Sequence, residues 1–147
     1  MATKLGLEAK CYYNANTYAA PTWTEITRVK DLTLSLEKGE FDVSTRAGGG
    51  WREIVNTLKD GSVEFGLLQA PTGTDTVFGA IRDAFLNGTS LEFLVLDGSS
   101  AASGSQGLRA TMTVSSFQRS ENLEEAIMYD VSVRPTPADN APAWYTV

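Results

Sequence analysis

The residues from Asp31 to Gln69 have the pattern of two β-strands separated by a long polar insert. Every second residue is apolar from 32 to 36 and again from 63 to 67, the two-residue period of a half-buried strand. The insert between them, 37–52, carries charges of both signs, isolated aromatic residues and three consecutive glycines. Hairpin loops usually contain about two to five residues. An insert of this length and composition therefore predicts a structured arm that orders against a partner.

The composition predicts one domain spanning 1–147. A chain of 147 residues with 42% hydrophobic residues can bury a real core. A net charge of −6 argues against a surface that binds duplex nucleic acid, which needs clustered Lys and Arg. The single cysteine, Cys11, excludes an internal disulfide, and its alternation with apolar neighbours predicts a buried core residue.

No apolar run approaches the roughly 20 residues that cross a bilayer, so no membrane contact is expected. Met1–Gly6 also lacks the apolar region of a signal peptide. We therefore expect the chain to be made in the cytoplasm and to stay reduced there.

Most of the remaining chain also alternates with period two. One helix is predicted over 75–87, with Thr74 or Asp75 as N-cap, Asn87-Gly88 as the stop and an apolar face at four-residue spacing. A turn is expected over 117–125 and an extended tail over 135–147. Besides the pair described above, the predicted strands are 5–13, 23–28, 91–96, 108–114 and 127–133. The predicted fold is mostly β: an antiparallel sandwich or barrel with one flanking α-helix and a long projecting arm.

The sequence predicts no catalytic site, metal or cofactor. The chain has no histidine, which excludes Ser-His-Asp, Cys-His and His-rich zinc sites. Gly48-Gly49-Gly50 lacks the Lys-Ser/Thr that follows a phosphate-binding loop, and Asp97-Gly98-Ser99 lacks the spacing of a calcium loop. The acidic residues of 121–125 are interpreted as a solvated turn.

Three features indicate that the chain does not act alone. The arm places aromatic residues among mixed charges, as interfaces do, although Trp51 folding back onto the core is the alternative. The tail ends in aromatic residues that would be costly to leave in water. Long edge strands need cover, which a closed ring of identical subunits supplies. The residues predicted to contact other subunits are Phe41, Val43, Arg46, Trp51, Arg52, Trp144 and Tyr145.

The order of these elements resembles the tail tube (major tail) proteins of long-tailed phages, with relatives in contractile injection systems and gene-transfer particles. The resemblance rests on Thr45–Arg52, Leu58–Phe65, the helix near Asp75–Phe85, Leu91–Val95 and Met112–Pro135. The chain ends soon after the last of these segments, without the additional immunoglobulin-like module of some relatives.

The resemblance implies a subunit that closes into a hexameric ring, with rings stacked into a tube in a virion tail. Neighbouring sheets would form an inner barrel through which genome DNA passes without tight binding, and the arm would reach an adjacent ring. Tail terminator, tape-measure and baseplate or tip proteins are the implied partners. Acidic residues facing the lumen would repel phosphate. By strand position, the candidates are Glu8, Glu64, Glu92 and Asp130.

Two alternatives stay open at this stage. A small carbohydrate-binding or adhesin-like β-sandwich could stack sugar rings on Trp51, Trp144 and Tyr12. A tube protein of a type VI secretion apparatus would share the ring architecture with a phage tail tube.

Overall fold

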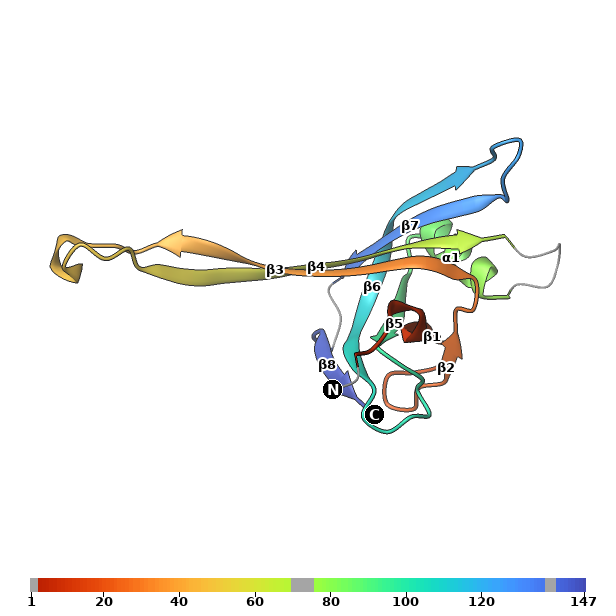
Figure 1. The fold of residues 1–147 in the computed structure, drawn as a ribbon, viewed down its shortest axis with the longest axis horizontal. Coiled ribbons are helices and arrows are strands. Elements are labelled where there is room, and N and C mark those ends of the chain that lie inside the picture. Colours follow the sequence, from red (N-terminus) through yellow and green to blue (C-terminus); the bar gives the residue numbers. More distant parts are fainter. Residues whose placement is uncertain (1–2, 70–75, 137–139) are drawn as a thin grey trace.

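The computed structural model describes residues 3–69, 76–136 and 140–147. These residues form eight antiparallel strands and one α-helix (Figure 1). The helix α1 (Thr76–Asn87) lies between β4 and β5, and short 3-10 turns span Gly6–Glu8 and Arg46–Gly48. The strands are β1 (Lys10–Asn14), β2 (Trp23–Glu25), β3 (Val29–Asp42), β4 (Ile54–Leu68), β5 (Ser90–Leu96), β6 (Gln106–Ser120), β7 (Met128–Pro135) and β8 (Ala143–Thr146). The predicted mostly β fold with a single helix is confirmed.

The strands form one sheet in the order β2-β1-β5-β6-β7-β4-β3, and β8 adds to β6. Strand β6 is shared: its first half pairs with β5 and β8, and its second half pairs with β7. A register shift interrupts the β7 ladder between Val114 and Ser116, as a β-bulge does. Side chains from both parts meet in one core, where Val63, Phe93 and Met112 are fully buried. The sheet therefore curls over its own core.

The helix covers the core at β6 and β7. The ring centroid of Phe78 lies 4.6 Å from that of Tyr129 on β7, and Ile81 is fully buried. Gly88 adopts a left-handed φ of 68°, the conformation that a helix stop requires, so the predicted C-terminal end is confirmed. The proposed N-caps at 74 and 75 lie outside the described residues. Within the described part of the chain, no helix is long and apolar enough to cross a membrane.

The predicted strand over 5–13 is wrong in its first half. The backbone N–H of Leu5 donates to the Glu8 carboxylate (2.9 Å) and helps to close a 3-10 turn, so β1 begins later. Leu5 and Leu7 are 59% and 83% exposed, and their alternation therefore marks no core face. Cys11, in contrast, is buried as predicted.

Two predicted boundaries near the C-terminus also change. The turn expected over 117–125 begins later, because β6 continues to Ser120. Phe117 belongs to the core: its ring centroid lies 5.2 Å from that of Tyr129. The tail expected to be merely extended ends in β8, which pairs with the first residues of β6. The tail therefore docks on its own chain.

Candidate assembly surfaces

The predicted arm, 37–52, is the outer part of a longer β-hairpin. Strands β3 and β4 stay paired as far as Asp42 and Ile54, and they project from the body as a two-stranded ribbon (Figure 1). We call residues 36–61 the hairpin arm. The ladder shifts register between Lys38 and Glu40. A Cβ on the intervening Gly39 would lie 2.4 Å from Oγ1 of Thr57, so a larger residue here would require the Thr57 side chain to move.

The tip of the arm is closed by its own hydrogen bonds. The N–H of Glu53 donates to the hydroxyl of Ser44 (2.8 Å), and the N–H of Ser44 donates to the Asp42 carboxylate (2.8 Å). Hydrogen bonds from the hydroxyl and the backbone of Ser44 hold the pKa of Asp42 below its ordinary value. Gly49 and Gly50 have φ values of 68° and 87°, which explains why glycines occupy this turn. The tip is therefore a defined structure that any partner would meet preformed.

The arm displays apolar side chains that its own fold does not cover. Phe41 pairs with Val55 across the ladder, and both are exposed. Trp51 is 79% exposed, so the alternative in which it packs onto the core is wrong. Arg46 begins the 3-10 turn at the tip, and Arg52 follows Trp51 in the chain, with its Nε 3.9 Å from the Asp42 carboxylate. The exposed large apolar residues of the arm are Leu36, Phe41, Val43, Trp51, Ile54, Val55 and Leu58.

The two aromatic residues of the tail have different surroundings. Trp144 is largely exposed, and its indole N–H donates to the side chain of Gln106 (2.9 Å). Tyr145 packs on its own chain, 6.4 Å from Trp23 between ring centroids, and thus needs no neighbour to cover it. Tyr12 is buried, and its hydroxyl accepts a hydrogen bond from the N–H of Ser100, which removes it from any sugar-stacking surface.

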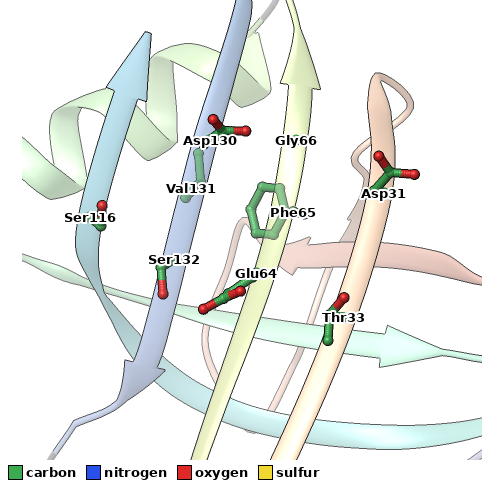
Figure 2. Close-up of a pocket in the computed structure, with 9 residues that line it drawn as sticks. All are labelled: Asp31, Thr33, Glu64, Phe65, Gly66, Ser116, Asp130, Val131 and Ser132. Atoms are coloured by element: carbon green, nitrogen blue, oxygen red, sulfur yellow. The ribbon is translucent and has the colours of Figure 1, made fainter. Parts of the chain in front are cut away.

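A second surface lies on the sheet formed by β6, β7, β4 and β3. Glu64 pairs with Ser132, which also pairs with Ser116, and cross-strand partners point to the same side. Figure 2 shows Asp31, Glu64 and Asp130 on this side, around a shallow hollow of about 350 Å³, with α1 behind the sheet. We call this side the acidic face. By register and lining, its residues are Asp31, Thr33, Ser35, Glu37, Asp60, Ser62, Glu64, Ser116, Gln118, Asp130, Ser132 and Arg134.

The acidic face carries uncompensated negative charge. Among the described residues, no cation forms an ion pair with Asp31, Glu64 or Asp130. The guanidinium of Arg134 is paired with Asp60 (3.3 Å) and leaves the other carboxylates of the face unneutralised. The alternate residues of β4 and β7 within the body are buried in the core, and Leu32 and Leu34 of β3 pack against it. These strands are therefore apolar on one side and polar on the other.

Two of the four predicted lumen residues, Glu64 and Asp130, meet on this face, and two do not. Glu8 lies in the N-terminal 3-10 turn rather than on a strand. Glu92 is buried on another part of the sheet, where its carboxylate pairs with the Nε of Arg109. A carboxylate buried beside a guanidinium contributes little field to a distant face.

Sequence reasoning missed three acids of this face: Asp31, Glu37 and Asp60. A signal for them was present, because Asp60 and Glu37 follow the same two-residue period as Glu64 and Thr33 on their respective strands. Glu37 opens the polar insert, and Asp31 and Asp60 lie just outside the apolar alternation, so each is at a point where the strand pattern weakens in the sequence.

The same part of the sheet has two open edges. Strand β3 pairs only with β4 in the described structure. Strand β6 pairs with β5 only as far as Thr113, so residues 116–120 pair with β7 alone. All neighbours in the series β6, β7, β4, β3 are antiparallel, and the two edge strands therefore run in opposite directions.

Comparisons with known proteins find the fold but no sequence family. No family model and no curated protein matches the chain. The chain is similar to a subunit in the "Tail of empty GTA particle computed with helical refinement, C6 symmetry", at 16% identity and TM-score 0.72, covering 99% of each chain. It is also similar to the SPP1 tail tube protein, at 16% identity and TM-score 0.73, covering 99% of this chain and 80% of the other.

A third similar structure comes from the "anti-feeding prophage (AFP) baseplate, 6-fold symmetrised". Identity is 8%, the TM-score is 0.66, and the match covers 100% of this chain and 99% of that one. These similarities place the chain in the tail tube fold that its sequence resembles.

Proposed function

We propose that this chain is a structural subunit that assembles into hexameric rings stacked as a tail tube, with a lumen through which DNA passes. One observation carries the proposal. The sheet formed by β6, β7, β4 and β3 has two open edges, and the side that faces away from the core is polar and acidic. A segment of a barrel wall requires both features. The six-fold symmetry of the similar assemblies supports the number of copies.

Ring closure follows from the directions of the edge strands. When β3 of one copy lies beside residues 116–120 of the next copy's β6, the two strands are antiparallel, so the pattern continues across each boundary. Six four-stranded segments give about 24 strands. Barrels of 16–18 strands already enclose an aqueous channel. The resulting cylinder is wide enough for a solvated lumen.

The acidic face would line that lumen. Duplex DNA is captured by Lys and Arg, which release its condensed counterions. A wall carrying Asp31, Glu64 and Asp130 repels phosphate instead, so a genome would slide without adhering. The subunit acts by enclosure, with no turnover of substrate. The hairpin arm would bridge to an adjacent ring, and terminator, tape-measure and baseplate or tip proteins would meet the completed tube along its interior and at its ends.

Negative-stain microscopy combined with sedimentation over a range of protein concentrations tests the proposal. We expect rings or tubes with six-fold end views and a sedimentation coefficient that rises with concentration. A monomer whose sedimentation is unchanged up to millimolar concentration would overturn it. Glycan binding by such a monomer would favour a carbohydrate-binding module, although the burial of Tyr12 argues against one.

A further inference from the structure

An apolar groove lies at the root of the hairpin arm, where the arm meets β8 and the end of β7. It has a volume of about 750 Å³, within the range of roughly 300–1,000 Å³ that proteins use to hold several apolar groups. Two of the side chains beside it, Leu36 and Trp144, are more than half exposed. We call it the root groove. Its lining includes Leu36, Lys38 and Lys59 from the arm, and Pro135, Pro142, Ala143 and Trp144 from β7, β8 and the residue before β8.

Two lysines at the root groove face each other within the isolated subunit. Lys38 lies directly opposite Lys59 in the β3–β4 ladder, and like charges in that position repel. Neither ammonium group has an ion-pair partner among the described residues. Leu36 is two residues before Lys38, so it projects from the same side of β3. Glu37 and Asp60 also line the groove, but strand alternation directs their side chains to the acidic face, where Asp60 pairs with Arg134. On its own side of the ladder, the groove combines apolar walls with two lysines that have no ion-pair partner in the described structure.

The tip of the hairpin arm has the opposite arrangement. Phe41 and Val55 form an exposed apolar pair, and Val43, also exposed, lies just beyond the end of β3. Residues 40–53 carry three carboxylates and two guanidinium groups, so the tip is negative by one charge. Arg52 contacts Asp42, whereas Glu40 and Glu53 are not paired with a cation in the described structure. Apolar side chains with nearby carboxylates are the complement of an apolar groove with lysines.

A subunit cannot fill its own groove with its own tip. The ladder between β3 and β4 continues to Asp42 and Ile54, and the ribbon leads away from its root (Figure 1). Eight residues of extended strand separate Leu36 from Ser44, a distance of about 26 Å. Folding back would break these paired strands. An arm tip that enters a root groove must therefore belong to another copy.

We infer that the root groove is the receptor for the hairpin tip of a second copy of this chain, with the tip's carboxylates near Lys38 and Lys59. This assignment rests on the proposed stacking function and names the surface that performs it. It commits each subunit to one donor contact, through its tip, and one acceptor contact, through its groove. Such a head-to-tail contact is heterologous and propagates without closing, as a growing tube requires.

Cross-linking between two single-site variants tests the assignment. Thr45→Cys marks the tip, where the Thr45 side chain makes no capping hydrogen bond, and Ala143→Cys marks the groove. Cys11 stays inert because burial raises its pKa to about 12. We mix the two variants, confirm tubes by microscopy, and add a short bismaleimide. We expect a covalent dimer joining one copy of each variant.

A matched control replaces the groove variant with Leu86→Cys, an exposed position on α1. Tubes with cross-links to 143 and not to 86 support the assignment. Tubes with no cross-link to 143, or with equal cross-linking to 86, overturn the groove while leaving the tube proposal intact. Absence of tubes in the parent protein would instead overturn the proposed function.

A charge reversal gives a second readout. Lys59→Glu places a carboxylate opposite Lys38, so the unfolding midpoint should stay equal or rise, while the rate of tube growth should fall at least tenfold. Arg82→Glu on α1 makes the same change of net charge away from the groove and should leave growth within twofold. Unchanged growth of the Lys59→Glu variant would overturn the groove assignment.

Discussion

The guanidinium of Arg109 lies over the ring of Tyr18, with its central carbon 3.8 Å from the ring centroid. The same guanidinium pairs with the buried carboxylate of Glu92 and donates from Nη2 to the backbone oxygen of Tyr18 (2.7 Å). Arg109 thus fastens the loop between β1 and β2 to strands β5 and β6. It also neutralises an acid that the sheet has removed from water.

Replacing Arg109 by Met should destabilise the subunit by about 3–5 kcal/mol, because Glu92 would remain buried without its counter-charge. The double variant Arg109→Met/Glu92→Met should recover most of that loss, since apolar pairs replace buried ion pairs well. Urea unfolding of the parent and the variants measures both effects. A loss below about 1 kcal/mol for Arg109→Met would contradict the role given to the pair.

The surroundings of Asp97 should make the stability of the subunit fall at acidic pH. Its carboxylate accepts the N–H of Gln106 (3.0 Å) and pairs with the ammonium of Lys4 (3.1 Å), and these partners hold its pKa below the ordinary 3.8. A carboxyl group with a depressed pKa stabilises the fold above its unfolded pKa, and this contribution disappears as pH falls through the folded value. Urea midpoints measured from about pH 7 to about pH 3 should therefore fall less for Asp97→Asn than for the parent. If the urea midpoints of the parent and of Asp97→Asn fall equally with pH, Asp97 does not contribute in this way.

Trp51 should contribute to assembly and not to folding. Its side chain is 79% exposed, so Trp51→Ala should change the free energy of unfolding by no more than about 0.5 kcal/mol. Burial of the indole at a contact between copies would make it an anchor worth about 2 kcal/mol or more, or roughly a thirtyfold rise in the critical concentration for tubes. Leu123→Ala, at a fully exposed position in the β6–β7 connection, is the control and should alter neither quantity. A large loss of thermal stability in Trp51→Ala would contradict the exposed position.

Shortening the hairpin arm should separate folding from stacking. Replacing residues 39–58 with Asn-Gly joins Lys38 to Lys59 through the two-residue turn that hairpins favour. None of the replaced residues belongs to the core, so the thermal midpoint should change little. Microscopy should find no long tubes. Tubes of normal length would show that the arm is only a surface feature.

The acidic face should decide whether DNA adheres inside a tube. The triple variant Asp31→Lys/Glu64→Lys/Asp130→Lys should retain short duplex DNA at low salt, with affinity falling as salt rises. That DNA should resist nuclease because the tube encloses it. A control with the same change of charge, Asp83→Lys/Glu121→Lys/Glu124→Lys, should leave any bound DNA digestible. Equal protection in both variants would refute the placement of the acidic face.

Period-two alternation predicts the central parts of β3, β4, β6 and β7, because one side of each of these strands packs on the core. Strand β5 is predicted instead from its nearly continuous apolar run, which is typical of a central strand. The same signal failed at Leu5 and Leu7, where a side chain from Glu8 closes a turn and no core lies beneath. Local hydrogen bonding outweighed a pattern of only two leucines. Strand β8 was missed because four residues are too few to establish a period.

The candidate surfaces were predicted less completely than the fold. Trp51 and Phe41 stand out in sequence because aromatic residues are rare in polar loops. The pairing of Glu92 with Arg109, and of Lys38 with Lys59, depends on strand register over long sequence separations. Register is set by the packed core, and no single strand reveals it.

Strand β6 is one unbroken backbone running through both halves of the curled sheet. In the proposed tube, a lateral force on the outer half of a subunit would therefore reach the acidic face through this backbone. This continuous strand would couple the two halves of each copy, so a filament would bend mainly at the contacts between copies.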